Sequence, residues 1–196
     1  MSDPPYGASL FELEQVGRCI RGQKSASVYM EIGSLAGGSL RAFGGTMPAG
    51  SLLIGVDRPK AGDYRADLLT AASDLRAGGY GVKLVFGNSR EPETIREAIQ
   101  ALGSRPIDVL FVDGDHTGFG VHSDFHNYLP RVSNGGLVIM HDVGPALRAA
   151  DGSGIRENQY RNTLNCFAAW CDLASRYHRK MIVQEHSGYG LVWLDK

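Results

Sequence analysis

Two short apolar runs each end in acidic residues and histidine, which can bind a metal ion or transfer protons. The first run leads into Asp113, Asp115 and His116, and the second leads into His141 and Asp142. Apolar runs this short predict buried strands rather than free-standing helices. In an open α/β sheet, ligands bind in the crevice at the carboxyl ends of the strands. We therefore expect these polar side chains to converge on one site for a hard metal ion or acid–base chemistry.

Apolar strand-like runs alternate with helix-like segments over most of the chain, and this alternation is typical of a doubly wound parallel sheet. The expected helices cover residues 8–22, 64–77, 92–102, 120–128 and 158–177. The expected strands cover residues 28–32, 51–56, 82–86, 107–112, 137–140, 181–185 and 189–194.

The last two expected strands are separated only by the tight turn at residues 186–188, so they must be antiparallel. The predicted fold class is therefore α/β: a Rossmann-like, doubly wound, mostly parallel seven-stranded sheet with a reversed C-terminal strand. A chain of 196 residues is most simply one domain, here residues 1–196 with an N-terminal helical segment over 1–27.

The charge balance limits the kinds of partner that we expect, and the cysteines indicate the cellular location. Lys plus Arg total 20 and Asp plus Glu total 21, so no nucleic acid or anionic membrane is expected as a partner. No apolar stretch approaches the ~20 residues of a membrane span. Cys19, Cys166 and Cys171 are odd in number and lack metal-ligand spacing. They indicate buried thiols in a reducing compartment, and the expected location is the cytoplasm.

A Gly-rich turn follows the first strand and is a candidate ligand-binding loop. It comprises Glu31, Gly33, Ser34, Gly37 and Ser39. Glycines there let the backbone approach a ligand, and the start of the next helix offers free N–H groups. The G-x-G-x-x-G spacing of a dinucleotide fold is absent. The Glu31 carboxylate would repel a pyrophosphate but would suit a ligand with a cationic amino group.

The ends of the next two strands supply further groups that suit a nucleoside. Asp57, followed by Arg58, ends the second strand, where a carboxylate can bind both ribose hydroxyls. Asn88 and Ser89 follow the third strand and could hydrogen-bond an adenine edge. Singly, the Gly-rich loop could be only a tight turn, and Asp57 only a solvated strand end or helix cap. Their occurrence at three successive strand ends favours a nucleoside site.

These motifs, in this order, resemble the class I S-adenosylmethionine-dependent methyltransferases. The resemblance is strongest to a small metal-dependent O-methyltransferase group that carries an Asp-Gly-Asp-His segment and a later His-Asp pair, here residues 113–116 and 141–142. That group is similar to the catechol and macrolide-sugar O-methyltransferases and to the cephalosporin hydroxylase-like proteins. The resemblance covers nearly the whole chain, from about residue 28 to 193, and implies S-adenosylmethionine as cofactor.

The resemblance also implies a divalent metal, bound by Asp113, His141 and Asp142. Asp113 is in addition an expected contact of S-adenosylmethionine. The metal-dependent relatives usually carry an acid or an amide where this chain has His141. Oxygen ligands suit Mg²⁺, and one imidazole shifts the preference toward Mn²⁺. The alternative is that Asp113 and Asp142 bind nothing and only cap strands or hold loops.

Methyl transfer to an oxygen requires in-line placement of that oxygen and removal of its proton. Two residues are candidate bases. Asp115 matches the position used in the sugar-modifying relatives, and His116 falls where the catechol enzymes carry a lysine. An imidazole with an ordinary pKa of about 6.5 suits this task at neutral pH. His116 is preferred for the proton, and Asp115 could orient the imidazole or act in its place.

The expected function is methylation of a hydroxyl group of a small molecule such as a sugar, a natural product or a catechol-like compound. One alternative is a nicotinamide-dependent oxidoreductase on a similar sheet, and another is a non-catalytic S-adenosylmethionine-binding module. The segment 151–158, with Arg148 and Arg156 near it, is a candidate lid over the substrate. Because the chain has short loops, we expect a homo-oligomer in which a neighbouring subunit supplies part of the substrate site.

Overall fold

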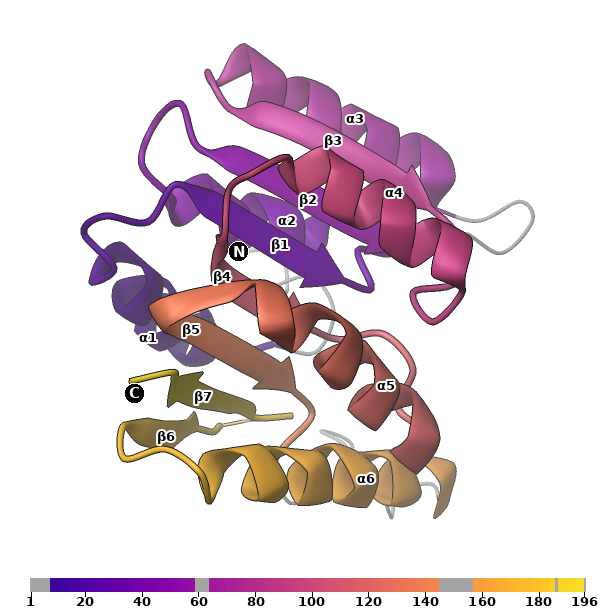
Figure 1. Ribbon diagram of the computed structural model, residues 1–196. Coiled ribbons are helices and arrows are strands. Elements are labelled where there is room, and N and C mark those ends of the chain that lie inside the picture. Colours follow the sequence, from indigo (N-terminus) through magenta and orange to yellow (C-terminus); the bar gives the residue numbers. More distant parts are fainter. Residues whose placement is uncertain (1–7, 59–63, 145–156, 186, 196) are drawn as a thin grey trace.

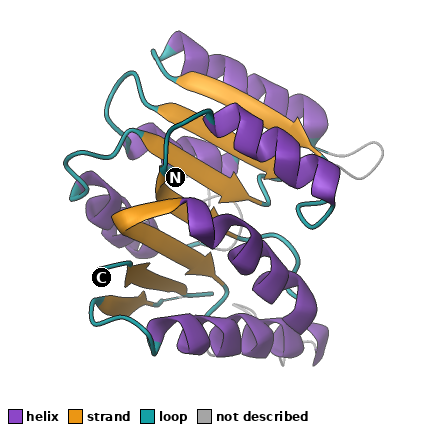
Figure 2. Cartoon of the chain, viewed as in Figure 1, coloured by secondary structure: helices purple, strands orange, loops and turns teal. Residues whose placement is uncertain are grey.

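The computed structural model describes residues 8–58, 64–144, 157–185 and 187–195. A central sheet carries helices on both faces (Figures 1 and 2). Its seven strands lie in the order β3-β2-β1-β4-β5-β7-β6. Their bounds are β1 Val28–Ile32, β2 Leu52–Asp57, β3 Gly81–Phe86, β4 Ile107–Val112, β5 Val132–His141, β6 Lys180–Val183 and β7 Tyr189–Trp193.

Strands β1 to β5 pair in parallel, whereas β7 runs antiparallel to both of its neighbours, β5 and β6. The predicted fold class, a mostly parallel seven-stranded sheet with a reversed C-terminal strand, is therefore confirmed. Because β1 to β5 are parallel, their carboxyl ends lie at one edge of the sheet, where the candidate site residues follow them.

Two apolar cores, one on each face, attach the helices to the sheet. Helices α1 (Leu10–Arg21), α2 (Gly38–Ala42) and α3 (Arg65–Ala77) pack on one face. Helices α4 (Pro92–Leu102), α5 (Gly118–Tyr128) and α6 (Glu157–Ala174) pack on the other. The central strands are buried from both sides, which explains their continuous apolar runs.

Local sequence signals set where the helices begin. Helix α1 starts with a capping box, in which Ser9 Oγ accepts from Glu12 N and the Glu12 carboxylate accepts from Ser9 N. Helix α4 has Pro92 in its first turn. At α5, Thr117 Oγ1 accepts from Gly120 N at 3.0 Å. This last cap ends the loop that carries His116.

Strand β5 differs from the sequence prediction. It begins at Val132 rather than at residue 137, because the polar and glycine-rich residues 133–136 stay hydrogen-bonded to the sheet. The register against β4 shifts between Ile107 and Val109, and Gly135 has a φ of +79°. Residues 133–136, whose composition is typical of a loop, thus form the irregular first part of a strand.

The cysteine prediction was wrong for two of the three residues. Cys166 is buried, but Cys19 is only partly buried and Cys171 is exposed. Cys166 and Cys171 are five positions apart on α6, which places them on different sides of that helix. In the part of the chain that the structure describes, no helix has both the length and the apolar character of a membrane span.

Candidate active site

A cleft of about 630 Å³ lies at the carboxyl edge of the sheet, a size that suits a small-molecule ligand. The strand order reverses between β1 and β4, and open α/β sheets bind ligands at such a switch point. The cleft is lined by Ile32, Gly33, Leu35, Val56, Asp57, Arg58, Gly87, Asn88, Ser89, Arg90, residues 113–116, His141 and Asp142.

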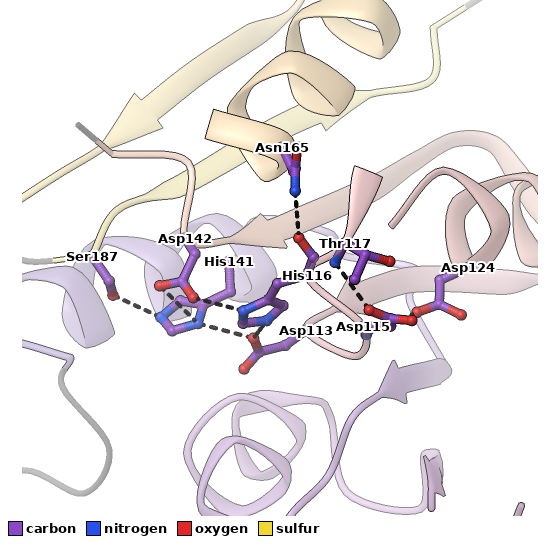
Figure 3. Close-up of polar contacts among 9 residues, drawn as sticks. All are labelled: Asp113, Asp115, His116, Thr117, Asp124, His141, Asp142, Asn165 and Ser187. Carbon is purple, nitrogen blue, oxygen red and sulfur yellow. Dashed lines mark hydrogen bonds and ion pairs between the residues drawn. The ribbon is translucent and has the colours of Figure 1, made fainter. Parts of the chain in front are cut away.

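Three potential metal ligands meet where β4 and β5 end. Asp113, His141 and Asp142 each offer one donor atom, and these atoms lie within 4.8 Å of one another. His141 Nδ1 is 3.0 Å from Asp113 Oδ1 and 3.6 Å from Asp142 Oδ1 (Figure 3). The structure thus brings together the residues that the sequence assigned to one site.

Asp142 has an unusual backbone conformation for a non-glycine residue, with a φ of +56°. The left-handed region is strained for most side chains, but Asp tolerates it better than most. This conformation turns the chain directly after β5, where the Asp142 carboxylate reaches both imidazoles of the cluster. Such outliers are enriched at functional sites.

His116 lies between the two carboxylates of the cluster. Its Nε2 donates to Asp113 Oδ1 at 3.0 Å, and its Nδ1 is 3.2 Å from Asp142 Oδ2. Ionised carboxylates only accept hydrogen bonds, so this arrangement suits an imidazolium with both nitrogens protonated. Burial alone would lower the pKa of His116, but the hydrogen bond to Asp113 and the charges of Asp113 and Asp142 raise it above 6.5.

The remaining pKa shifts in the cluster have the same electrostatic origin. Burial alone would raise the pKa of Asp113, but the His141 charge and the hydrogen bonds from His116 and His141 hold it well below its usual range. Burial alone would lower the pKa of His141, but mainly Asp113, with Asp142, raises it to about 9. The cluster thus stabilises positive charge beside its carboxylates, as a cation-binding site must.

Asp115, the alternative base, makes contacts outside this cluster. Its Oδ1 accepts from Thr117 N at 2.9 Å, and its Oδ2 is 3.1 Å from Arg90 Nη2. Figure 3 shows Asp115 on the side of the loop near Asp124, away from His141. Asp115 still lines the cleft, but its carboxylate is occupied by an arginine and a backbone amide. Of the two candidate bases, His116 contacts Asp113 and Asp142 of the cluster, whereas Asp115 contacts Arg90 and Thr117.

The Gly-rich loop lies against the end of β4, and glycine is required there for close approach. Gly33 has a φ of +91°, and a Cβ at this position would lie 2.1 Å from the Asp113 carbonyl oxygen. At Gly37, with a φ of +81°, a Cβ would lie 2.5 Å from the Ala71 side chain. These glycines therefore allow the loop to pack closely against β4 and α3, independently of any ligand.

Glu31 is fully buried beneath this loop rather than lining the large cleft. Its Oε2 accepts from Tyr29 Oη at 2.9 Å, and burial raises the pKa of Glu31 to about 7. Its Oε1 and the neighbouring Ser34 Oγ are buried without a hydrogen-bond partner among the described residues. Ser34 and Ser39 line a smaller, mainly apolar pocket beside Asp113. Buried polar atoms without partners are costly, so these two oxygens are suited to a ligand.

Asp57 and Arg58 line the large cleft at the end of β2, as the sequence predicted. The Asp57 carboxylate accepts from Leu35 N and so also fixes the Gly-rich loop. Burial raises the pKa of Asp57, partly offset by the backbone hydrogen bonds of Leu35 and Ser34. One side chain therefore joins two of the predicted ligand-binding segments.

Ser89 and Asn88 also line the cleft, but their side chains already have partners. Ser89 Oγ donates to Asp124 Oδ1, and Asn88 Oδ1 accepts from Arg90 N at 3.2 Å. Asp124 is fully buried, and its Oδ2 also accepts from Asp115 N at 3.4 Å. It therefore ties the loop after β3 to the loop after β4.

Sequence reasoning missed four residues of this network. Asp124 carried one usable signal, since it is an acid on the buried side of a helix next to Phe125. Ser187, which lies 2.8 Å from His141, belongs to an ordinary-looking turn. Asn165 donates to the His116 carbonyl oxygen at 3.0 Å, and Arg90 pairs with Asp115. Neither residue has a sequence pattern that indicates these contacts.

The predicted lid falls largely outside the described residues. Arg148, Arg156 and residues 151–156 lie in the undescribed range 145–156, and α6 begins at Glu157. The lid stays a prediction.

The fold and the site together define an α/β domain with a cluster of carboxylates and imidazoles at the switch point of its sheet, and comparison with known families identifies its class. The methyltransferase domain family matches residues 30–143, which is more than half of the chain. The chain belongs to this family. The match includes the Gly-rich loop, the Asp-Gly-Asp-His segment and the His-Asp pair, and it favours a methyltransferase over a nicotinamide-dependent oxidoreductase.

Individual relatives agree with this assignment. An 8-demethyl-8-alpha-L-rhamnosyl tetracenomycin-C 2'-O-methyltransferase of Streptomyces olivaceus is 32% identical over 62 residues, covering 32% of this chain and 16% of the relative. An O-methyltransferase from Bacillus cereus, solved in complex with SAH (S-adenosylhomocysteine), has a TM-score of 0.67 at 14% identity, covering 97% of this chain and 84% of that one.

A third relative is the MycE methyltransferase from the mycinamycin biosynthetic pathway, solved in complex with Mg and SAH. It has a TM-score of 0.57 at 22% identity and covers 91% of this chain and 48% of that one. At these identities the structural likeness shows the fold alone. The alignments with the first curated relatives span 11%, 53% and 16% of the lengths of those proteins.

Proposed function

We propose that this protein is an S-adenosylmethionine-dependent O-methyltransferase that methylates a hydroxyl group of a small molecule, assisted by a divalent metal ion. The observation that carries the proposal is the meeting of Asp113, His116, His141 and Asp142 at the switch point of a methyltransferase-family sheet. This is where the fold places a ligand, and these residue types can bind a cation and accept a proton.

S-adenosylmethionine fits the groups that line the edge of the sheet. We place its methionine end at the Gly-rich loop, where Glu31 Oε1 and Ser34 Oγ are buried, have no hydrogen-bond partner among the described residues, and suit an ammonium group. We place its ribose on Asp57 and its adenine near Asn88 and Ser89, which line the same cleft. Because Ser89 Oγ donates to Asp124 and the Ser89 carbonyl oxygen accepts from Tyr128 Oη at 3.1 Å, we expect the adenine to contact this loop through other atoms.

The donor set of Asp113, His141 and Asp142 fits a divalent cation, with Mg²⁺ and Mn²⁺ as candidates. Two carboxylates and one imidazole leave further positions for water and a substrate oxygen. MycE, solved with Mg and SAH, supports the presence of a metal in this fold. When bound, the metal would stabilise negative charge on the acceptor oxygen and lower the pKa of its hydroxyl.

The residues of this chain then have distinct tasks in the transfer. In the neutral form of His116, the ring nitrogen that carries no hydrogen accepts the proton of the acceptor oxygen. This oxygen attacks the methyl carbon while the carbon–sulfur bond breaks. S-adenosylhomocysteine is the leaving group, and no external oxidant or reductant is needed. Asn165 Nδ2 donates to the His116 carbonyl oxygen at 3.0 Å and so holds the backbone that carries this imidazole. Arg90 and Thr117 keep Asp115 out of the reaction.

The acceptor class we favour is the hydroxyl of a sugar or another natural product, with a catechol-like compound as the alternative. The similarity to a rhamnosyl tetracenomycin 2'-O-methyltransferase supports a sugar. The near-zero net charge of −1 favours a small molecule over a nucleic acid as partner. A cytoplasmic location and a homo-oligomer are further parts of this proposal.

Ligand-induced stabilisation separates this function from the oxidoreductase alternative. S-adenosylhomocysteine at 100 times its dissociation constant should stabilise the fold by about 2.7 kcal/mol and raise the melting temperature, whereas NAD should not. A shift with NAD and none with S-adenosylhomocysteine would reverse the assignment. Mass spectrometry of sugar and catechol acceptors with S-adenosylmethionine then tests catalysis, and transfer to none of them would favour a non-catalytic binding module.

Replacing Asp57 tests the placement of the ribose. Asp57→Ala should weaken S-adenosylhomocysteine binding by about 1.5–3 kcal/mol, the value of hydrogen bonds to a charged group. The matched control is Asp108→Ala, because Asp108 also accepts from two backbone amides, Ser27 N and Val28 N, but at the opposite edge of the sheet. An unchanged dissociation constant for Asp57→Ala in calorimetry would contradict the placement of the ribose on Asp57.

A further inference from the structure

Ser187 contacts the side of the His141 ring that faces away from the carboxylates. Ser187 Oγ lies 2.8 Å from His141 Nε2, while His141 Nδ1 lies 3.0 Å from Asp113 Oδ1. Figure 3 shows Ser187 and Asp113 on opposite sides of the ring. Both ring nitrogens thus have a partner, and the ring orientation is defined by contacts on two sides.

The turn that carries Ser187 is fixed to the residues that follow β5. Gly144 N donates to the Ser187 carbonyl oxygen at 2.9 Å, and Val143 N donates to the Gly188 carbonyl oxygen at 3.3 Å. Gly188 has a φ of +81°, and a Cβ there would lie 2.5 Å from Gly144 N. The backbone beside Ser187 is therefore packed directly against the segment that begins with His141 and Asp142.

A buried carboxylate fixes the same turn from the other side. Glu12, on α1, is fully buried, and its Oε1 accepts from Glu185 N at 2.9 Å and from Gly188 N at 3.1 Å. The Tyr189 ring also packs on the His141 ring, with 4.7 Å between their centroids. A hydroxyl whose neighbouring backbone is held by these hydrogen bonds can define the orientation of an imidazole.

We propose that Ser187 is a positioning residue that fixes His141 with Nδ1 as the metal-binding nitrogen. An imidazole that binds a metal through Nδ1 carries its hydrogen on Nε2, and here Nε2 would donate it to Ser187 Oγ. The serine thereby selects the tautomer and prevents the ring from turning its other nitrogen toward Asp113. This inference rests on the proposed metal-assisted function and adds to it a residue from the β6–β7 turn.

The test is the affinity of the full chain for Mn²⁺, measured by electron paramagnetic resonance without any methyl acceptor. Ser187→Ala should weaken Mn²⁺ binding by about 10–100-fold, the usual effect of removing a group that orients a metal ligand. Ser187→Thr, which keeps a hydroxyl, should bind close to the wild-type value. Ser133→Ala is the matched control, since Ser133 Oγ donates to Asp108 at the opposite end of β5.

Further measurements distinguish the expected result from a general structural defect of Ser187→Ala and from a failure of the proposal that the site binds a metal. Melting of the metal-free protein and its affinity for S-adenosylhomocysteine should be the same for Ser187→Ala and wild type. If Ser187→Ala binds Mn²⁺ as tightly as wild type, or if S-adenosylhomocysteine affinity falls equally, the positioning inference is wrong and the metal proposal stands. If the wild-type protein binds no Mn²⁺, both the metal proposal and this inference are overturned.

Discussion

Removal of divalent metal with EDTA should abolish methyl transfer, and Mg²⁺ or Mn²⁺ should restore it. The physical reason is the close approach of two carboxylates, Asp113 and Asp142, which needs compensating positive charge. In the structure, His116 and His141 provide it, each with a ring nitrogen 3.0 Å from Asp113 Oδ1. A divalent ion can replace this compensation and also stabilise charge on the acceptor oxygen, an effect worth several kcal/mol in such sites.

Asp142→Asn is the variant that tests this prediction directly. It removes one charge from the cluster at nearly constant shape, so the metal concentration needed for activity should rise. Asp108→Asn is the control, because it removes a carboxylate from the opposite edge of the sheet. Full turnover in chelator, with the metal content measured as absent, would show that the cluster only stabilises the two strand ends.

The residues at the ends of the strands could be predicted from the sequence because the fold class alone brings them together. Asp57, Asp113 and His141 each follow an apolar run, and parallel strands deliver such residues to one edge. No side-chain contact had to be known for this step. The prediction therefore depended on the local strand pattern and on the general rule that ligands bind at the carboxyl ends of parallel strands.

The contacts that complete the site could not be predicted, because they join segments far apart in the sequence. Ser187 and His141 are 46 positions apart, and Ser89 and Asp124 are 35 apart. The sequence predicted Ser89 as an adenine contact, and the structure adds that its hydroxyl is bound to a buried acid. Hydroxyl groups of serine occur in many turns, so their type and position carry little information about a distant partner.

His116→Ala should lower kcat by roughly 10²–10⁴, the usual effect of losing a general base. The affinity for S-adenosylhomocysteine should change little, because the cofactor is placed on residues 31–39, Asp57 and the loop after β3. His126→Ala is the matched control. His126 is an exposed histidine on α5 whose Nδ1 lies 2.8 Å from the His122 carbonyl oxygen, so its loss should leave kcat unchanged.

The pH dependence gives a second measurement of the same proton transfer. Only a neutral imidazole can accept the proton, so the rate should rise with pH through the pKa of His116. In the metal-free protein, burial alone would lower this pKa, but the hydrogen bond to Asp113 and the charges of Asp113 and Asp142 raise it above 6.5. A divalent ion bound to the same carboxylates would offset their charges, so the pH at which the rate rises should fall as the metal saturates the site. His116→Ala should lose this dependence. If Asp115 were the base, Asp115→Asn would be the severe variant, and mild losses in both variants at saturating metal would exclude a side-chain base.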